Sequence, residues 1–157
     1  MPRPRLVPLV VLVIGAALLS GCSPTVAVDA AEDANDPRCA DVMVVLPSVI
    51  EGQERRWTDA QATAAWGDPS AVIMTCGVVP PGPTEAQCIT VGGVDWIVDD
   101  SKAPTYRVVT YGRVPAVEVI SDNEAVGPTD VLSALGKILQ SRLTRESECV
   151  ESSSRVP

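Results

Sequence analysis

The side chains of this 157-residue sequence that could do chemistry are its carboxylates and its five cysteines, because the chain contains no histidine. The lack of histidine excludes a Ser-His-Asp triad, a Cys-His pair and every His-ligated metal site. Asp95, Asp99 and Asp100 form the densest acidic cluster. On a strand, Asp95 and Asp99 would share a face about 13 Å apart, at roughly 3.3 Å per residue. That is too far for a shared metal ion or a glycosidase carboxylate pair, so we expect no catalytic residue there.

A second acidic group, Asp122, Asn123, Glu124 and Asp130, offers oxygen atoms of the kind that bind Ca²⁺. Its spacing does not match an EF-hand loop, so we expect no metal site and no cofactor. A hydrolase that works with carboxylates alone stays open as an alternative. It would need an Asp/Glu pair about 5–10 Å apart in a cleft.

Four cysteines, Cys39, Cys76, Cys88 and Cys149, follow the first one, Cys22. Without histidine or a C-x-x-C motif, nothing in the sequence activates a thiol or forms a recognisable metal site. An even number of cysteines in an exported chain indicates two disulfides, for which three pairings exist. We favour Cys76–Cys88, which closes a short Pro/Gly-rich loop, and Cys39–Cys149, which joins the two ends of the domain.

The N-terminus has the pattern of a bacterial lipoprotein signal peptide. Arg3 and Arg5 precede an apolar stretch over residues 6–19, which is too short to span a hydrocarbon core of about 30 Å. The sequence Leu-Ser-Gly-Cys that ends at Cys22 resembles the lipobox, which implies cleavage before Cys22 and a diacylglyceryl thioether on its sulfur. We therefore expect a lipid-anchored, palmitoylated protein on the outer face of the cytoplasmic membrane.

The chain divides into four parts. We predict a signal peptide at 1–21, a flexible lipidated tether at 22–36, one globular domain at 37–150 and a disordered tail at 151–157. Loss of Arg3 and Arg5 with the leader takes the formal charge from −8 to −10. Such an acidic chain repels phosphate backbones, so we expect no nucleic-acid partner.

Helix signals stand at both ends of the domain and strand signals between them. Asp36-Pro37 and residues 127–130 each have a helix start pattern, a capping residue or glycine followed by proline. Residues 71–78, 88–91, 94–98, 106–111 and 114–120 are rich in β-forming residues, whereas residues 58–66 are ambiguous and allow a helical turn. We predict an α+β fold, a small antiparallel sheet of about four to five strands with an N-terminal and a C-terminal helix packed on it.

Tryptophan and arginine supply the candidates for ligand or partner contact. In a chain without phenylalanine, we expect Trp66 and Trp96 to complete an aliphatic core. Trp57 follows two arginines and is the tryptophan expected at the surface. Arg113, expected at a hairpin tip, is the second candidate contact residue, although a turn arginine is commonly just solvated.

An ordered set of short motifs resembles the actinobacterial lipoprotein family catalogued as domain of unknown function 3515. The motifs are Trp66-Gly67-Asp68-Pro69, Thr75-Cys76-Gly77-Val78, Val94-Asp95-Trp96 and Tyr111-Gly112-Arg113-Val114-Pro115. The chain departs from the family pattern at Thr75, where a basic residue is usual. The resemblance implies a coherent fold and an envelope location, and it implies no activity.

These observations together predict an exported, membrane-anchored lipoprotein with a non-enzymatic binding or assembly role in the cell envelope. Its partner would be an envelope protein or a small-molecule ligand. The alternatives are the carboxylate hydrolase above and a structural or regulatory partner of a membrane enzyme.

Overall fold

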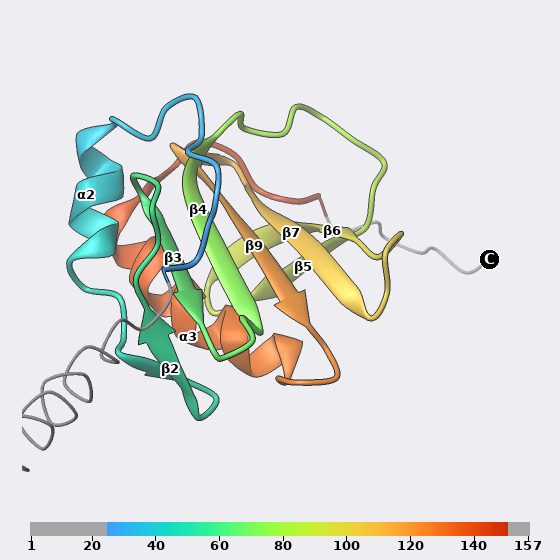
Figure 1. Cartoon of the computed structure of the whole chain (residues 1–157). Helices are drawn as coiled ribbons and strands as arrows, with labels where there is room; N and C mark the ends of the chain where they lie inside the picture. The colour runs from blue at the N-terminus through green and yellow to red at the C-terminus, as the bar shows by residue number, and fades with distance from the viewer. Residues whose placement is uncertain (1–24, 151–157) are drawn as a thin grey trace, which may run out of the picture.

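The computed structural model describes residues 25–150, and one antiparallel sheet of eight strands dominates it (Figure 1). The expected leader, the expected lipidation residue Cys22 and the tail 151–157 lie outside the described residues. The strands of the large sheet, in their spatial order, are β1 (Val49–Ile50), β2 (Gln53–Arg56), β3 (Thr63–Trp66), β4 (Val72–Val78), β9 (Ala116–Asp122), β7 (Thr105–Tyr111), β6 (Val94–Asp99) and β5 (Cys88–Val91). A small second sheet pairs β8 (Arg113–Val114) with β10 (Thr144–Arg145).

Two helices accompany the sheet, and both begin where the sequence predicts. In α2 (Pro37–Met43), Asp36 is the N-cap and its side chain accepts a hydrogen bond from the Arg38 N–H. In α3 (Pro128–Arg142), proline again occupies the first turn. One side of α3 is buried through Val131, Leu132, Leu135 and Leu139. Helix α3 lies across one face of the sheet, and α2 lies beside the edge that carries β1 to β3 (Figure 1).

The centre of the core is the β4–β9 pair with its neighbours. Strand β4 buries five of its seven residues, as the nearly continuous apolar run predicts. The predicted hairpin around Gly112 is confirmed, since β7 pairs with β9 from Thr105↔Asp122 to Val109↔Glu118. Gly92, in the turn between β5 and β6, lies so close to the α3 backbone at Gly136 that a side chain there would overlap it.

The prediction of an α+β fold with a small sheet was wrong. Residues 25–150 are mostly β, with eight strands in one sheet, a small second sheet and two short helices. The missed strands have local sequences without a strand signal. Strands β1, β8 and β10 are two residues long, too short for alternation to show. Strand β3 is buried at all four positions, so its alanines and Trp66 do not alternate with polar residues.

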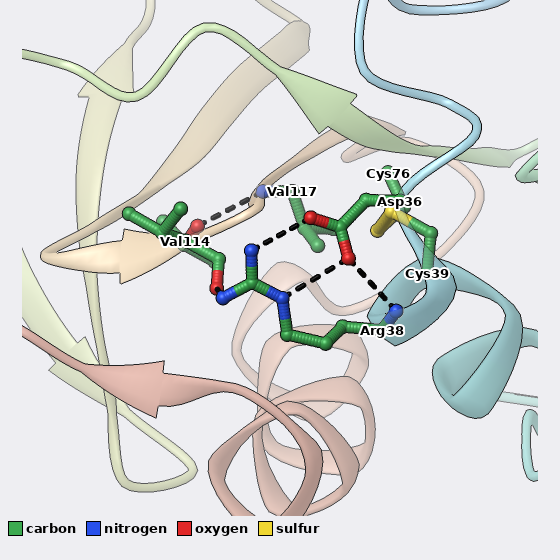
Figure 2. The surroundings of a disulfide bond; sticks show 7 residues. Asp36, Arg38, Cys39, Cys76, Val114 and Val117 are labelled. Atoms are coloured by element: carbon green, nitrogen blue, oxygen red, sulfur yellow. Dashed lines mark hydrogen bonds and ion pairs between the residues drawn. A yellow bond between two sulfur atoms is a disulfide. The ribbon is translucent and has the colours of Figure 1, made fainter.

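The predicted disulfide pairing was also wrong, although the chain does form two disulfides. The bonds are Cys39–Cys76, with Cα atoms 5.7 Å apart, and Cys88–Cys149, with Cα atoms 6.4 Å apart. Cys76 lies on β4 and Cys88 on β5, with β9, β7 and β6 between them. Four strand spacings amount to about 19 Å, far beyond the reach of one disulfide. Figure 2 shows Cys76 bonded instead to Cys39 on α2.

Residues 25–36, predicted to belong to a flexible tether, lie against the domain. The Val26 N–H donates to the Trp57 carbonyl at 2.8 Å, and the Asp59 N–H donates to the Val26 carbonyl at 3.2 Å. Farther along, the Asp33 N–H donates to the Gly77 carbonyl at 3.0 Å, and Ala34 is buried. The described part of this segment is therefore held at both ends by backbone hydrogen bonds.

Among the described residues, no helix is long and apolar enough to cross a membrane.

Candidate functional site

A groove with a volume of about 930 Å³ separates α2 from strands β2 and β3. Its wall on the helix side includes Met43 and Val44, and its wall on the strand side includes Arg55 and Trp57. The segment from Ala34 to Pro37 also lines the groove. Within the described residues, β1 is the edge strand of the large sheet, and β2 and β3 follow it.

Exposed apolar side chains concentrate at this groove. Trp57 is 84% exposed, Val44 is 79% exposed and Val49 is 49% exposed, and all three line it. They are three of the five large hydrophobic residues that are exposed in the described part of the chain. Single exposed hydrophobic residues are ordinary, but a group of them around one concavity is typical of an interaction site. The expectation that Trp57 lies at the surface is confirmed.

Arg55 places a positive charge in the strand wall of the groove. Its Nη1 donates to the Met43 carbonyl at 3.4 Å, which links β2 to the last turn of α2. Burial lowers the pKa of the Arg55 guanidinium. An arginine nevertheless stays protonated at neutral pH. The groove thus combines apolar side chains with two arginines, Arg55 and Arg56, on its strand side.

Asp36 lines the groove, but its carboxylate is engaged by Arg38 (Figure 2). Its Oδ1 accepts from the Arg38 N–H at 2.8 Å and from Nε at 3.0 Å, and its Oδ2 accepts from Nη2 at 2.6 Å. The hydrogen bonds from the Arg38 side chain, more than those from its backbone, lower the pKa of the Asp36 carboxyl. Arg38 Nη1 also donates to the Val114 carbonyl at 2.7 Å. This carboxylate is suited to fixing the start of α2 rather than to moving a proton.

Arg113 is not at an exposed hairpin tip. It is 5% exposed, and its guanidinium donates to the Leu143 carbonyl at 2.7 Å and to the Gly93 carbonyl at 3.2 Å. Burial, reinforced by the nearby charge of Arg145, lowers the pKa of Arg113, and Asp95 opposes that shift. The cation lies at the C-terminal end of α3, where a helix dipole favours it. Neither the ligand-contact interpretation nor the solvated-turn interpretation of Arg113 holds; the residue joins α3 to the β5–β6 turn.

Asp95 and Asp99 of the acidic cluster accept hydrogen bonds from other residues of the domain. Asp95 accepts from Thr90 Oγ1 at 2.6 Å and from the Cys149 N–H at 3.0 Å. Asp99 accepts from the Ser101 N–H at 3.1 Å, and hydrogen bonds from Ser101 lower the pKa of its carboxyl. Asp122, in the second acidic group, accepts from the Glu124 N–H at 2.9 Å. Within residues 25–150, no group of three or more Cys, Asp or Glu side chains is arranged to hold a metal ion.

The residues of the sequence motifs serve packing. Trp66 and Trp96 are fully buried, as expected, and their indole N–H groups donate to the carbonyls of Pro47 and Val91, each at 3.1 Å. Gly77 has φ +95° and faces the Asp33 backbone so closely that a Cβ would overlap it. Gly112, with φ +64°, faces Ser147 in the same way. The motifs therefore mark where distant segments meet, and the groove lies elsewhere.

Sequence reasoning missed most of the groove. It identified Trp57, but not Val44, Val49 or Arg55. These residues come from a short helix, a two-residue strand and a polar strand. No local pattern signals that these elements face one another.

One family model matches the chain. It is described as Protein of unknown function (DUF3515), and it matches residues 5–147. No curated protein and no solved structure matches the chain. Because the match covers most of the sequence and agrees with the ordered motifs above, the chain belongs to the DUF3515 family of proteins of unknown function.

Proposed function

We propose that this protein is an exported lipoprotein, anchored through Cys22 on the outer face of the cytoplasmic membrane, and that its domain is a non-enzymatic binding module of the cell envelope. The signal-peptide pattern and the lipobox support the anchor. The groove beside α2 supports binding as the role of the domain. The observation that carries the proposal is Trp57, a large aromatic side chain that is 84% exposed on the rim of a concave site.

The chemistry of the groove favours an apolar ligand group. Trp57, Val44 and Val49 offer a surface whose contact with an apolar partner would remove it from water. Tryptophan gives a large contact area with little loss of side-chain freedom, and it is enriched where binding energy concentrates. Arg55 adds one charged group that can orient a polar end of the ligand. Two carboxylates line the groove, Asp36 and Glu54, and Asp36 is held in an ion pair with Arg38. That pairing does not favour the two cooperating carboxyl groups that a glycosidase needs.

Mass spectrometry of the protein purified from membranes tests the anchor. We expect the mature N-terminus at Cys22 with a diacylglyceryl group on its sulfur. The Cys22→Ala variant should keep its leader and carry no lipid. An unmodified Cys22 in the soluble fraction of wild-type cells would refute the anchor.

Site-specific photo-cross-linking tests the groove. A photoreactive phenylalanine derivative in place of Trp57 should form an adduct in native membranes, and the mass of the adduct should distinguish lipid from protein. The matched control carries the same group in place of Val150. Val150 is also exposed, but it follows Cys149, which is bonded to Cys88 on β5 at the other edge of the sheet. Val44→Asp should abolish the adduct at position 57, because a charge would enter the apolar wall. Equal adducts at both positions would contradict a binding role for the groove.

A further inference from the structure

The free length of chain between the proposed anchor and the domain is short. Val26 is fixed to Trp57 and Asp59 by two backbone hydrogen bonds, of 2.8 Å and 3.2 Å. Cys22 is four residues before Val26. Four residues span at most about 14 Å even when fully extended. The Val26 backbone would therefore lie within about 14 Å of the Cys22 backbone, whose side chain carries the glyceryl group and its acyl chains.

This attachment point determines which side of the domain faces the membrane. The Trp57 backbone carbonyl accepts the hydrogen bond from the Val26 N–H, so the exposed indole belongs to the residue at which the chain is attached. Val44 and Val49 extend the apolar surface along the same groove. The opposite edge of the sheet carries β5 and, through Cys88, the chain near Val150. The headgroup layer is only several Å thick. A short connection to the lipid therefore brings the side of the domain that carries the groove close enough to contact the headgroups.

The charge of the groove also permits contact with a membrane surface. Without the leader, which contains Arg3 and Arg5, the chain would carry a formal charge of −10, which is unfavourable near anionic lipids. The groove lining, in contrast, contains two acidic residues, Asp36 and Glu54, and two basic ones, Arg55 and Arg56. Its formal charge is therefore balanced. The groove lining itself therefore adds no net charge to the repulsion between the acidic molecule and anionic lipids.

From these observations we infer that the groove face rests on the bilayer that holds the anchor, with Trp57 inserted at the boundary between headgroups and acyl chains. Tryptophan is enriched at that depth in membrane proteins because its ring is apolar and its N–H is polar. The inference rests on the proposed function, since it requires the lipid on Cys22. It makes membrane lipid the partner of the groove.

Tryptophan fluorescence of the full-length lipoprotein in vesicles tests this inference. The protein, purified from membranes, is reconstituted into phosphatidylcholine vesicles with or without dibrominated acyl chains. Bromine quenches an indole only near the chains, and Trp66 and Trp96 are buried in the core. We expect the brominated lipid to remove most of the Trp57 emission, and Trp57→Phe to abolish the quenchable component. The double variant Trp57→Phe, Val150→Trp supplies a matched indole at the opposite edge and should not be quenched.

Each other outcome overturns the inference. Unquenched Trp57 emission in brominated vesicles would mean that the groove faces away from the bilayer. Equal quenching at positions 57 and 150 would mean that the domain has no fixed orientation. A further outcome is that bromine does not quench Trp57, while protection of Trp57 from aqueous iodide increases with the density of protein in the vesicles. That result would mean that a second copy of the chain covers the groove. The mass spectrum of Cys22 reports the anchor separately, so failure of the anchor and failure of the orientation are distinguishable.

Discussion

At the scale of single residues, the buried cation Arg113 connects three segments that are distant in the sequence. Its guanidinium donates to the carbonyl of Leu143, the residue that follows α3, and to the carbonyl of Gly93 in the β5–β6 turn. Its Nε has no hydrogen-bond partner among the described residues. Such a residue contributes through the acceptors that it satisfies, since carbonyls buried without a donor are costly.

Arg113→Ala should lower the free energy of unfolding by about 3 kcal/mol, because it leaves two carbonyls of the domain without their charged donor. Urea unfolding measures the change. Arg145→Ala is the control, since Arg145 is exposed and pairs with the exposed Glu148. It should change stability by less than about 0.5 kcal/mol. Equal effects of the two variants would contradict the structural role of Arg113.

The Asp36 carboxylate should make stability depend on acid pH. Its pKa in the folded protein is lowered by Arg38, so the charged form contributes stability above the unfolded pKa of about 3.9. That contribution is lost as the pH falls through the folded pKa. Asp36→Asn keeps a capping side chain but removes the charge. Wild type should be more stable than Asp36→Asn at pH 7, and the difference should disappear at strongly acid pH in urea titrations. A difference that is the same at both pH values would contradict this assignment.

At the scale of elements, the segment 25–36 acts as a strap that joins β2, β4 and α2. Its backbone bonds to Trp57 after β2 and to Gly77 within β4. At its end, Asp36 caps α2, and Cys39 of the helix is bonded to Cys76 of β4. The strap borders the groove at Ala34, so its position defines one end of the candidate site.

Gly77→Ala should displace this strap. The new Cβ would overlap the Asp33 backbone, and φ at this position is +95°, which L residues with side chains avoid. We expect the free energy of unfolding to fall by at least about 2 kcal/mol. We also expect a protease to cleave within residues 25–36 faster than in the wild type, because the displaced segment becomes accessible. Gly82→Ala is the control, because it has open space around its Cα and no positive φ, and it should be neutral. Unchanged proteolysis of Gly77→Ala would show that the strap does not depend on this contact.

At the scale of the whole molecule, two disulfides connect the sheet to segments outside it. Cys39–Cys76 closes a sequence separation of 37 residues between α2 and β4, and Cys88–Cys149 closes one of 61 residues between β5 and the C-terminal segment. Cys76 lies on the central strand β4, whereas Cys88 lies on the edge strand β5. Each restricts the unfolded chain independently of the other.

The double variant Cys39→Ser, Cys76→Ser should lower stability by about 4 kcal/mol in the entropic model of loop closure. Thermal unfolding with and without reductant measures the effect. Peptide mapping under non-reducing conditions should recover the Cys39 peptide linked to the Cys76 peptide. Recovery of a Cys76–Cys88 peptide would contradict the sheet order as well as the pairing.

Much of the local structure follows from the sequence. The starts of α2 and α3, the buried strand β4, the hairpin of β7 and β9 and the burial of Trp66 and Trp96 depend on capping residues, apolar runs and residue size. Such signals act between residues a few positions apart. The exposure of Trp57 beside two arginines belongs to the same class, and it is the part of the candidate site that could be predicted.

Only the tertiary structure decided the remaining features. The disulfide pairing depends on the order of strands in the sheet, and the burial of Arg113 depends on the path of the chain after α3. The groove exists because residues 34–37, α2 and β1 to β3 meet at one edge, and the segment from Val26 is fixed there by Trp57. These contacts join short elements whose own sequences carry weak signals. Their position is set by the packing of the whole sheet, because only burial against distant segments compensates for the entropy of ordering them.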